Sequence, residues 1–429
     1  MTYSETIRCL YELRFFGAKF GLENTLKLAT LAGHPQERLR FIHVAGTNGK
    51  GSTCAMLESI YRAAGLRIGL FTSPHLVSFR ERIQVNRRLI GKDDVVRLVE
   101  ELQPLLGQFA PGHHPTFFEV VTVMALKFFC EQNCDLVIWE TGLGGRLDAT
   151  NIVTPLASVI TNIQLDHQQW LGDTLARIAA EKAGIIKPGV PVLTATVESE
   201  ALAVIERIAK EKGAPLTVIP NSKFRIPDSA LSLPGEHQRI NAALAIAVVK
   251  VLRKPVPVSE ESIRAGLANV RWAGRLQLIT SDAGRKVLLD GAHNPAGAKT
   301  LAETLRSDFS QEKPTLILGV LQDKDWRHIC QTLAPLAGCI LTVPVLSERS
   351  ADPTTLADSC RSINASADVI ACSSIGEALQ RSSDHAFRVI TGSLYLVGEA
   401  LERLGLSPAA TEERALNEWT AEAALPACG

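Results

Sequence analysis

The stretch LRFIHVAGTNGKGSTCAMLESIYRAA, residues 39–64, decides the fold. It opens with a short apolar run that is typical of a buried strand. A loop with glycines at positions 46, 49 and 51 follows, and a helical period begins directly after it. Strand, glycine loop and helix in this order indicate the first βα unit of an α/β fold.

The chemistry of this glycine loop favours phosphate binding. Glycines let backbone N–H groups approach phosphate oxygens, and the start of the following helix favours negative charge. Lys50 can reach the outer phosphates, and Ser52 or Thr53 can hold Mg²⁺. The spacing departs from GxxxxGK[ST], because Gly51 separates Lys50 from Ser52. A plain glycine turn that closes a βα unit is the alternative. The predicted phosphate-binding residues are Gly49, Lys50, Gly51, Ser52 and Thr53.

From residue 39 onward, short β-branched runs alternate with helical periods, as in a parallel sheet covered on both faces. Strands are predicted at Leu39–Ala45, Leu66–Phe71, Asp135–Glu140, Ala157–Thr161, Val190–Thr194 and Leu216–Ile219. Helices are predicted at Thr53–Ala64, Asp94–Leu106, Glu119–Cys130 and Thr174–Ala183. The N-terminal part is therefore expected to be an α/β domain with a parallel sheet.

The pattern restarts after the Pro-spaced segment KPVPVSEES and the stretch RWAGRLQL. The second series of strands is predicted at Lys286–Asp290, Thr315–Gly319, Cys339–Val343, Asp368–Ala371 and Arg388–Thr391. This series predicts a smaller, doubly wound, Rossmann-like unit. We place the boundary near 272–276, which gives domains at 1–273 and 274–429 and a cleft between them.

Composition excludes several classes of protein. The chain has 429 residues, of which 46% are hydrophobic and 21% charged, so it is neither disordered nor a coiled coil. Lys+Arg and Asp+Glu both number 45, which predicts no nucleic-acid or membrane partner. The nine cysteines include no CxxC pair, which favours a reducing compartment. Cys130 and Cys134 have a spacing that a metal site could use, but structural thiols are the simpler interpretation. Without a signal peptide or an apolar span, a cytoplasmic location is expected.

Two further side chains lie where a phosphate-bound Mg²⁺ could use them. Glu140 ends the predicted strand DLVIWE, and the carboxyl ends of parallel strands share one edge of the sheet. His167 follows the end of the next strand. The alternative to metal binding is that Glu140 is only a solvent-exposed residue at a strand end and that His167 is only a hydrogen-bonded loop residue.

A lysine lies on the apolar face of the helix predicted at Thr174–Ala183. Asp173 is expected to cap its N-terminus and Gly184 to follow its C-terminus. At 100° per residue, the apolar stripe of this helix consists of Leu175, Ile178, Ala179 and Lys182. Lys182 could extend to solvent. Alternatively it points into a site, where burial would lower its pKa and permit modification of the amine.

Six motifs together carry a family resemblance: GTNGKGS, FTSPHL, ETGLGGRLDATN, LDH, EKAGIIKPG and LDGAHNP, in this order. The chain resembles the bacterial folylpolyglutamate synthases of the bifunctional dihydrofolate synthase type, within the Mur ligase superfamily. The resemblance covers roughly residues 10–400. It implies an ATP-dependent amide ligase that adds L-glutamate to dihydropteroate and to reduced folates through an acyl phosphate. The family also implies a monomer.

The resemblance assigns roles by position. Lys50, Lys182 and His293 are implied to be catalytic, and Lys182 matches a lysine that is carbamylated in the family. Ser73, Glu140 and His167 are implied to bind Mg²⁺. Nucleotide contacts are implied for the glycine loop and for Asn241, Arg275 and Asp290. The implied pterin contacts are Ala18, Lys19, Phe20, Thr116, Phe117, Phe118, Glu119, Leu147, Asp148 and Ala149.

The loop at Asp290 is also interpretable from the residues alone. Asp290 ends a predicted strand, and Asn294 and Pro295 are expected to be the N-cap and first residue of the next helix. A loop that only ends a strand is the alternative.

Other activities are compatible with parts of this pattern. A P-loop kinase explains Lys50, Ser52 and Glu140 but gives no role to Lys182 or to the second α/β domain. Another Mur-type amino-acid ligase, acting on a uridine-linked cell-wall precursor, and a nucleotide-gated binding module also stay open.

Overall fold

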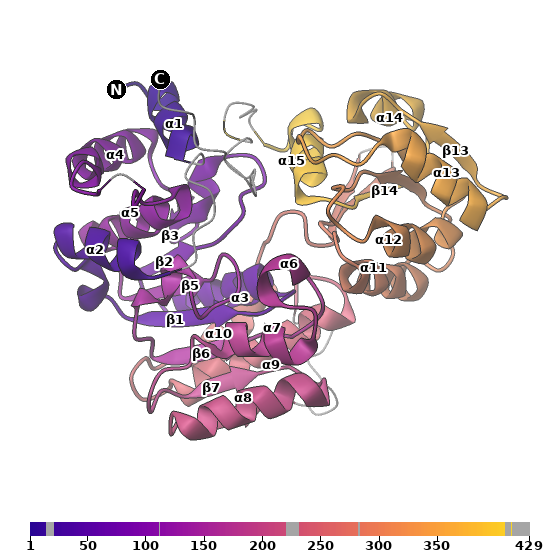
Figure 1. Cartoon of the computed structure of the whole chain (residues 1–429). Helices are drawn as coiled ribbons and strands as arrows, with labels where there is room; N and C mark the ends of the chain where they lie inside the picture. Colours follow the sequence, from indigo (N-terminus) through magenta and orange to yellow (C-terminus); the bar gives the residue numbers. More distant parts are fainter. Residues whose placement is uncertain (14–20, 111, 220–230, 282–283, 408–412, 414–429) are drawn as a thin grey trace. The chain divides into compact units, whose positions relative to one another are not determined.

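The computed structural model describes residues 1–13, 21–110, 112–219, 231–281, 284–407 and 413. These form two compact units (Figure 1). The first unit contains the described residues up to Ser232 together with Gln238–Val270. The second unit contains Arg271–Arg414 and also the short segment Leu233–His237, which precedes the boundary expected from sequence. Each unit has its own sheet.

The first unit is built on an eight-stranded sheet of order β4-β3-β2-β5-β1-β6-β7-β8. Its strands are β1 (Phe41–Ala45), β2 (Ile68–Phe71), β3 (Ile83–Val85), β4 (Arg88–Leu89), β5 (Leu136–Glu140), β6 (Ala157–Ile160), β7 (Val192–Thr194) and β8 (Leu216–Val218). From β2 to β8 the neighbours are parallel, whereas β3 and β4 are antiparallel additions at one edge. The central strand β1 is buried along its whole length.

The register of three central strands places the glycine loop. Val44 of β1 pairs with Glu140 of β5, and Ala45 pairs with Ile160 of β6. The carboxyl ends of β1, β5 and β6 therefore lie together at one edge of the sheet. The glycine loop, Glu140 and the segment that carries His167 all follow these strand ends.

Helices cover both faces of this sheet. Helix α3 packs on β1, β2 and β5, and α10 packs on α3. On the opposite face, Phe41, Phe71 and Trp139 form one core with α1, α2, α4 and α5. The helices of this unit are α1 (Tyr3–Glu12), α2 (Glu23–Leu31), α3 (Lys50–Ala63), α4 (Lys92–Leu106), α5 (Phe117–Glu131), α6 (Gln168–Leu171), α7 (Leu175–Ala183), α8 (Ser199–Glu211), α9 (Glu236–Val251) and α10 (Glu260–Ala268). Short 3₁₀ turns lie at Pro35–Arg38, Phe79–Arg82 and Ala149–Ile152.

The second unit has a six-stranded sheet of order β13-β12-β11-β14-β10-β9. Its strands are β9 (Gln277–Thr280), β10 (Lys286–Leu289), β11 (Thr315–Leu318), β12 (Cys339–Thr342), β13 (Asp368–Ala371) and β14 (Phe387–Thr391). Its helices are α11 (Pro295–Asp308), α12 (Trp326–Leu333), α13 (Pro353–Ile363), α14 (Ile375–Arg381) and α15 (Leu394–Arg403), with a 3₁₀ turn at Ala334–Leu336. All neighbours are parallel except β9, which runs antiparallel to β10.

The strand ends of the second sheet pack closely at their carboxyl edge. A Cβ on Gly319 would lie 2.9 Å from the Val343 carbonyl oxygen, and a Cβ on Gly392 would lie 2.5 Å from the Gly319 carbonyl oxygen. A Cβ on Gly291 would overlap the Leu394 side chain. The loops after β10, β11, β12 and β14 are therefore in mutual contact along this edge.

The predicted fold class is confirmed, and the predicted strands of both series are present with small shifts at their ends. Three antiparallel strands, β3, β4 and β9, were not predicted. Helix α3 begins at Lys50, earlier than the predicted Thr53, because the loop turns into the helix at Gly49.

The predicted caps of α7 need correction. Thr174, not Asp173, is the N-cap, since its hydroxyl accepts from the Arg177 N–H at 3.2 Å. Gly184 keeps a right-handed φ of −60° as the C-cap, so it is not a left-handed C′ glycine. By contrast, Asn294 caps α11 and Pro295 opens it, as predicted.

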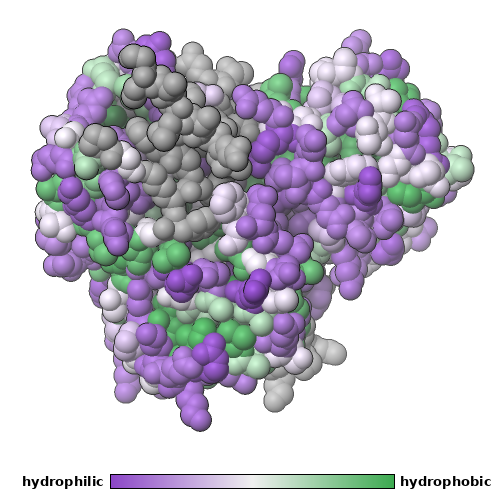
Figure 2. Space-filling model, in the orientation of Figure 1, coloured by the Kyte–Doolittle hydropathy of each residue, from purple (hydrophilic) through white to green (hydrophobic). Residues whose placement is uncertain are grey.

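The surface mixes hydrophilic and hydrophobic residues, with a hydrophobic area where α7 and α8 of the first unit lie (Figure 2). Among the described helices, none is long and apolar enough to cross a membrane. The cysteines in the described ranges are free thiols, and Cys130 donates to the Pro35 carbonyl at 3.1 Å.

Candidate active site

The glycine loop has the backbone shape that a phosphate site needs. Gly46 has φ +148° and Gly49 has φ +84°, both in the region that favours glycine. Gly49 is the N-cap of α3, so the first N–H groups of the helix begin at Lys50. A Cβ on Gly46 would overlap the Thr161 hydroxyl, which donates to the Asn48 carbonyl at 2.6 Å. Thr161 thus fixes the loop from the neighbouring strand end.

Two lysines meet at one carbonyl of this loop. Lys50 Nζ donates to the Gly46 carbonyl at 3.1 Å and to the Thr47 carbonyl at 3.2 Å. Lys182 Nζ, from α7, donates to the same Gly46 carbonyl at 2.8 Å. The structure therefore brings together two residues that are far apart in the sequence and were both predicted to be catalytic.

Lys182 is deeply buried, with 4% of its surface exposed. It shares the buried face of α7 with Ile178 and Ala179, as the stripe predicted. Burial and, secondarily, the charge of Lys50 lower its pKa to about 7, against the opposing effects of Asp166 and Asp148. Near neutral pH, much of this amine is therefore unprotonated and able to react as a nucleophile.

Helix α9 closes another side of the loop. A Cβ on Gly49 would lie 2.6 Å from Asn241 Oδ1, so this predicted nucleotide-binding side chain lies against the loop. Gln238, one turn earlier, donates to Ser52 Oγ at 3.2 Å and accepts from Asn241 Nδ2 at 3.0 Å. Both amides are buried. The first turns of α3 and α9 are thus linked by a polar network.

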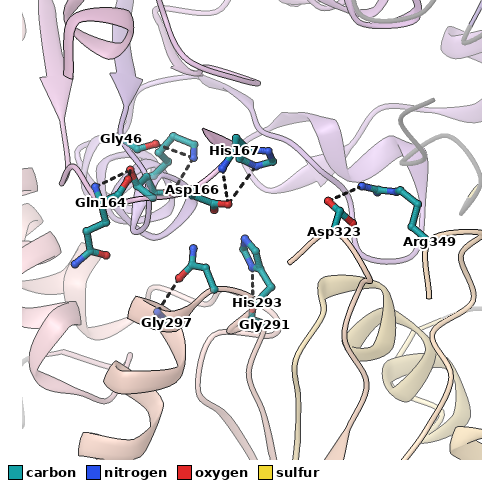
Figure 3. A network of polar contacts seen from close by, with 12 residues as sticks. Gly46, Gln164, Asp166, His167, Gly291, His293, Gly297, Asp323 and Arg349 are labelled. Atoms are coloured by element: carbon teal, nitrogen blue, oxygen red, sulfur yellow. Dashed lines mark hydrogen bonds and ion pairs between the residues drawn. The ribbon is translucent and has the colours of Figure 1, made fainter. Parts of the chain in front are cut away.

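The predicted metal-binding residues lie at the same sheet edge. Glu140 is buried, and one carboxylate oxygen accepts from the Ser73 N–H at 3.1 Å. The pKa of the Cys54 thiol, in α3, is raised mainly by burial and in second place by the negative charge of Glu140. Glu140 therefore lies near that helix. His167 has a backbone N–H that donates to Asp166 Oδ1 at 2.8 Å, and its ring Nε2 lies 4.0 Å from the same oxygen (Figure 3).

Hydroxyl and carboxylate oxygens are donors that Mg²⁺ prefers, with waters and phosphates completing its shell, whereas an imidazole is a less usual ligand for this ion. Within the described ranges, no three His, Cys, Asp or Glu side chains lie together as a metal-binding group. The residues present fit a shell of this mixed kind, in which the protein supplies few ligands.

Two of the three predicted pterin segments meet at Gly142. A Cβ on Gly142 would lie 2.5 Å from the Phe118 ring and 3.2 Å from Asp148 Oδ2. The segments Thr116–Glu119 and Leu147–Ala149 are therefore neighbours. The third segment, Ala18–Phe20, lies outside the described residues.

The carboxylates of these segments also have structural roles. Glu119 accepts from the Thr116 N–H at 2.7 Å in a capping box and from the Thr25 hydroxyl at 3.3 Å. Asp148 accepts from the Leu143 N–H at 2.8 Å and from the Thr150 N–H and hydroxyl. Burial raises the pKa of Asp148, and these hydrogen bonds oppose that shift. Both side chains hold the segments that were predicted from sequence to contact a pterin.

In the second unit, the residues predicted to bind nucleotide surround the end of β10. Asp290 accepts from the Leu276 N–H at 2.9 Å and from the Ala292 N–H at 3.0 Å. Burial raises its pKa, while the nearby charge of Arg275 opposes the shift. The pKa of His237 is lowered to about 4, mainly by burial and in second place by the positive charge of Arg275.

The His293 ring is fixed by its own loop. Its Nδ1 lies 2.8 Å from the Gly291 carbonyl oxygen (Figure 3). Because a carbonyl only accepts, Nδ1 must carry a proton. The ring can then gain or lose a second proton at Nε2.

Comparison with known proteins gives consistent matches along the chain. Residues 44–218 match the Mur ligase middle domain, and residues 274–394 match the Mur ligase glutamate ligase domain. A dihydrofolate synthase/folylpolyglutamate synthase of Bacillus subtilis is 37% identical over 91% of this chain and 96% of its own. A folylpolyglutamate synthase of Lacticaseibacillus casei is 34% identical over 80% of this chain and 86% of its own.

This chain belongs to the folylpolyglutamate synthase family of ATP-dependent ligases. Solved structures agree. The Thermotoga maritima folylpolyglutamate synthase has a TM-score of 0.84 and 35% identity, covering 96% of this chain and 98% of its own. An Escherichia coli relative, solved in complex with DHPP and ADP, has a TM-score of 0.84 and 29% identity, covering 95% and 98%.

Sequence reasoning missed two parts of this family's glycine loop. Thr161 was assigned only to a strand end, although a Thr at that point can reach a neighbouring loop. Gln238 was not assigned, although it precedes Asn241 by one turn and so shares its helix face. The spacing of these two amides was the available signal.

Gly46→Ala is expected to destabilise the first unit. The added Cβ meets the Thr161 hydroxyl and adopts an unfavourable φ, so we expect the free energy of unfolding to fall by about 2–4 kcal/mol, measured by urea denaturation. Gly65→Ala is the matched control, because Gly65 also has a positive φ, +86°, but its Cβ would meet nothing within 4 Å. Equal losses in both variants would disprove the role of the Thr161 contact.

Proposed function

We propose that the protein uses ATP to join L-glutamate to dihydropteroate and to reduced folates. The observation that carries this proposal is the pair of lysines on the Gly46 carbonyl, in a chain that matches dihydrofolate synthase/folylpolyglutamate synthase along 91% of its length. A cytoplasmic monomer, with these small molecules as substrates and no nucleic-acid or membrane partner, stays the prediction made from sequence.

The proposed reaction has two steps. A carboxylate oxygen of the folate attacks the γ-phosphorus of ATP, and ADP leaves, which gives an acyl phosphate. The glutamate amine then attacks the acyl carbon, loses a proton, and displaces inorganic phosphate to form the amide. Phosphorylation is needed because a carboxylate is a poor electrophile, and the charge that develops must be stabilised by placed groups.

The glycine loop and Lys50 act on the triphosphate in this proposal. The N–H groups of Gly51 and Ser52, at the start of α3, donate to phosphate oxygens. Lys50 moves from the loop carbonyls to the γ-phosphate oxygens. Asn241 contacts the nucleotide beside Gly49. The nucleotide contacts of Arg275 and Asp290, in the second unit, stay the prediction made from sequence.

Ser73, Glu140 and His167 would hold Mg²⁺. The ion would neutralise charge on the phosphates when bound. The position of Glu140 supports this role, because its carboxylate lies at the carboxyl end of β5 and accepts from the Ser73 N–H at 3.1 Å.

Lys182 is proposed to carry a carbamate. Its unprotonated amine would attack CO₂, lose a proton and become an anion. The lowered pKa supports this step, because only the neutral amine reacts with CO₂. The carbamate would then lie beside Lys50 as an anionic partner of that ammonium.

His293 is proposed to exchange a proton at Nε2 during the second step. The pterin is proposed to contact Phe117 and Phe118, with Ala18–Phe20 and Leu147–Ala149 around it. Glu119 holds the start of α5, and Asp148 holds the loop from Leu143 to Thr150.

A substrate matrix tests the proposed function. Phosphate release is measured with ATP and either dihydropteroate or a reduced folate, each with and without L-glutamate. A ligase releases phosphate at a sustained rate only when glutamate is present. A kinase accumulates phosphorylated pterin without glutamate, another Mur-type ligase turns over only with a uridine-linked peptide, and a binding module consumes negligible ATP. Any of these three results would replace the proposed function.

The metal assignment is tested by two neighbouring variants. His167→Ala is expected to raise the Mg²⁺ concentration for half-maximal activity by about ten- to hundred-fold, since a ligand is lost. Asp166→Ala removes the acceptor of the His167 N–H and a negative charge that acts on Lys182, and it is expected to have a milder effect on the Mg²⁺ requirement. Magnesium titrations of both variants make the comparison. The reverse order of effects would show that Asp166, not His167, is the ligand.

A further inference from the structure

His43, in the central strand β1, is a fully buried histidine to which neither the sequence motifs nor the proposed mechanism gives a role. It pairs in register with Trp139 of β5, so both side chains leave the same face of the sheet. Both reach Thr150, in the 3₁₀ turn Ala149–Ile152. The His43 ring has Nε2 at 2.9 Å from Thr150 Oγ1, and Trp139 Nε1 donates to the Thr150 carbonyl at 3.0 Å.

Thr150 passes this contact on to Asp148. Its hydroxyl donates to Asp148 Oδ1 in a short hydrogen bond, and its N–H donates to the same oxygen at 3.0 Å. The other oxygen, Asp148 Oδ2, accepts from the Leu143 N–H at 2.8 Å. The side chains of His43, Thr150 and Asp148 are all buried. A polar chain of three side chains therefore runs from the centre of the sheet to the predicted pterin segment Leu147–Ala149.

The proton positions in this chain follow from the donors around Asp148. Burial raises the pKa of Asp148, whereas its hydrogen bonds lower it. Because N–H or O–H donors point at both oxygens, they favour the carboxylate form. The Thr150 hydroxyl has one proton, which it gives to Asp148. Thr150 Oγ1 must then accept a hydrogen bond from His43, so the proton of the His43 ring lies on Nε2.

The other nitrogen of the His43 ring agrees with this assignment. Burial and, in second place, the positive charge of Lys187 lower the pKa of His43 to about 3, so near neutral pH the ring is neutral and has a single N–H. His43 Nδ1 has no hydrogen-bond partner among the residues that the structure describes. A buried N–H without a partner is rarer than a buried acceptor without one. A proton on Nε2 and a bare Nδ1 are therefore the favoured tautomer.

The Asp148 end of the chain lies where two predicted pterin segments meet. A Cβ on Gly142 would lie 3.2 Å from Asp148 Oδ2 and 2.5 Å from the Phe118 ring. The carboxylate is thus close to the aromatic side chain from the start of α5. A shift of Asp148 would move the segment Leu147–Ala149 relative to Phe118.

We propose that His43 and Thr150 are positioning residues for the pterin site. The N–H at His43 Nε2 orients the Thr150 hydroxyl, and that hydroxyl holds the Asp148 carboxylate and, with it, the loop at residues 142–150 beside Phe118. The proposal rests on the proposed ligase function and adds two residues that act through Asp148. A loop that is held in place before the pterin arrives lowers the entropic cost of binding.

The proton on the His43 ring is measured without any substrate. Long-range ¹H–¹⁵N NMR spectra of histidine rings distinguish the two neutral tautomers. We expect the His43 signal, identified by its loss in His43→Gln, to show a proton on Nε2 at neutral pH. A proton on Nδ1, or a mixture of the two tautomers, would overturn the proposal whatever the enzyme's activity.

Thr150→Val removes the hydroxyl and keeps the shape of the side chain. We expect the KM for dihydropteroate and for a reduced folate to rise about ten- to hundred-fold, because a hydrogen bond to a charged acceptor is lost, while the KM values for ATP and L-glutamate change less than about two-fold. Thr150→Ser keeps the hydroxyl and should stay close to the wild type. Thr194→Val is the matched control, since Thr194 is fully buried in β7 of the same sheet and donates to Thr196 Oγ1 at 2.9 Å.

His43 variants test the first link of the chain. His43→Gln keeps an N–H donor and should keep the pterin KM near the wild-type value, whereas His43→Leu has no donor and should raise it as Thr150→Val does. The double variant His43→Leu with Thr150→Val should show no further rise, because both changes break one chain. A double variant whose effects simply multiply would overturn the proposal.

The thermal midpoint of each variant shows whether it folds, and Thr150→Val and Thr194→Val should lose similar stability. If His43→Leu does not fold, the comparison of Thr150→Val with Thr150→Ser decides. An unchanged pterin KM in folded Thr150→Val, or an equal rise in Thr194→Val, would overturn the proposal. Glutamate-dependent turnover of the wild type, measured first, tests the ligase function separately.

Discussion

Lys50→Ala is expected to lower kcat by about a thousandfold or more, because the side chain places an ammonium against the glycine loop. In the free protein its ammonium is held by the Gly46 and Thr47 carbonyls, at 3.1 and 3.2 Å. This contact keeps the side chain beside the loop, from where it can move to a phosphate. Phosphate release under saturating ATP, folate and glutamate is the measurement.

The control for this variant is Lys250→Ala, in the last turn of α9, where the side chain is exposed. It should retain wild-type turnover. Lys50→Arg should recover little, since the guanidinium is wider than the ammonium that fits between the two carbonyls. A kcat for Lys50→Ala close to that of the wild type would refute the assignment of the loop as the phosphate site.

Lys182→Ala is expected to lower kcat by about a hundredfold, because the proposed carbamate is lost beside Lys50. Added short carboxylates should restore part of the activity by entering the space left by the side chain. NMR with isotope-labelled bicarbonate should show a carbamate signal in the wild type that is absent from Lys182→Ala. Lys210→Ala, exposed on α8, is the control for non-specific loss of charge.

The pH dependence follows from the buried amine. The pKa of Lys182 falls from 10.5 to about 7 in the folded protein. Between these values the unfolded chain binds a proton that the folded, unmodified chain does not. The free energy of unfolding should therefore rise with pH across this window, and this rise should be absent in Lys182→Ala.

Carbamate formation should also increase with pH. Below a pH of about 7 the amine of Lys182 is increasingly protonated and cannot react with CO₂. Activity and the carbamate signal should therefore fall together as the pH is lowered through that value. A wild-type protein with no carbamate signal at any pH, together with full activity of Lys182→Ala, would exclude the modification.

The sequence predicted the parallel core well because its signals are local. The β1 stretch, the glycine loop and α3 are contiguous, and each has its own pattern of apolar residues and glycines. The antiparallel strands β3, β4 and β9 were missed for the opposite reason. Strand β4 has only two residues, Arg88 and Leu89, both exposed, so its place depends on pairing with β3 rather than on periodicity.

In the candidate site, too, the features with a local sequence signal were predictable and the long-range contacts were not. Helix periodicity alone placed Lys182 on the buried face of α7. Its contact with the Gly46 carbonyl spans 136 positions and could not be inferred from spacing. The structural role of Asp148 was also hidden, because its partners in the loop include backbone N–H groups, which a sequence does not distinguish. Glu119 differs, because its spacing from Thr116 is that of a capping box and was a readable signal.

The close packing of Gly319, Gly392 and the Val343 carbonyl limits how this edge of the second sheet can be redesigned. Side chains cannot be added at these glycines without moving neighbouring backbone. Substitutions at this edge would therefore have to be placed in the outer parts of the loops, at residues 322–326 and 345–350. Random mutagenesis libraries directed at these two segments should retain folded proteins, whereas libraries directed at the glycines should not.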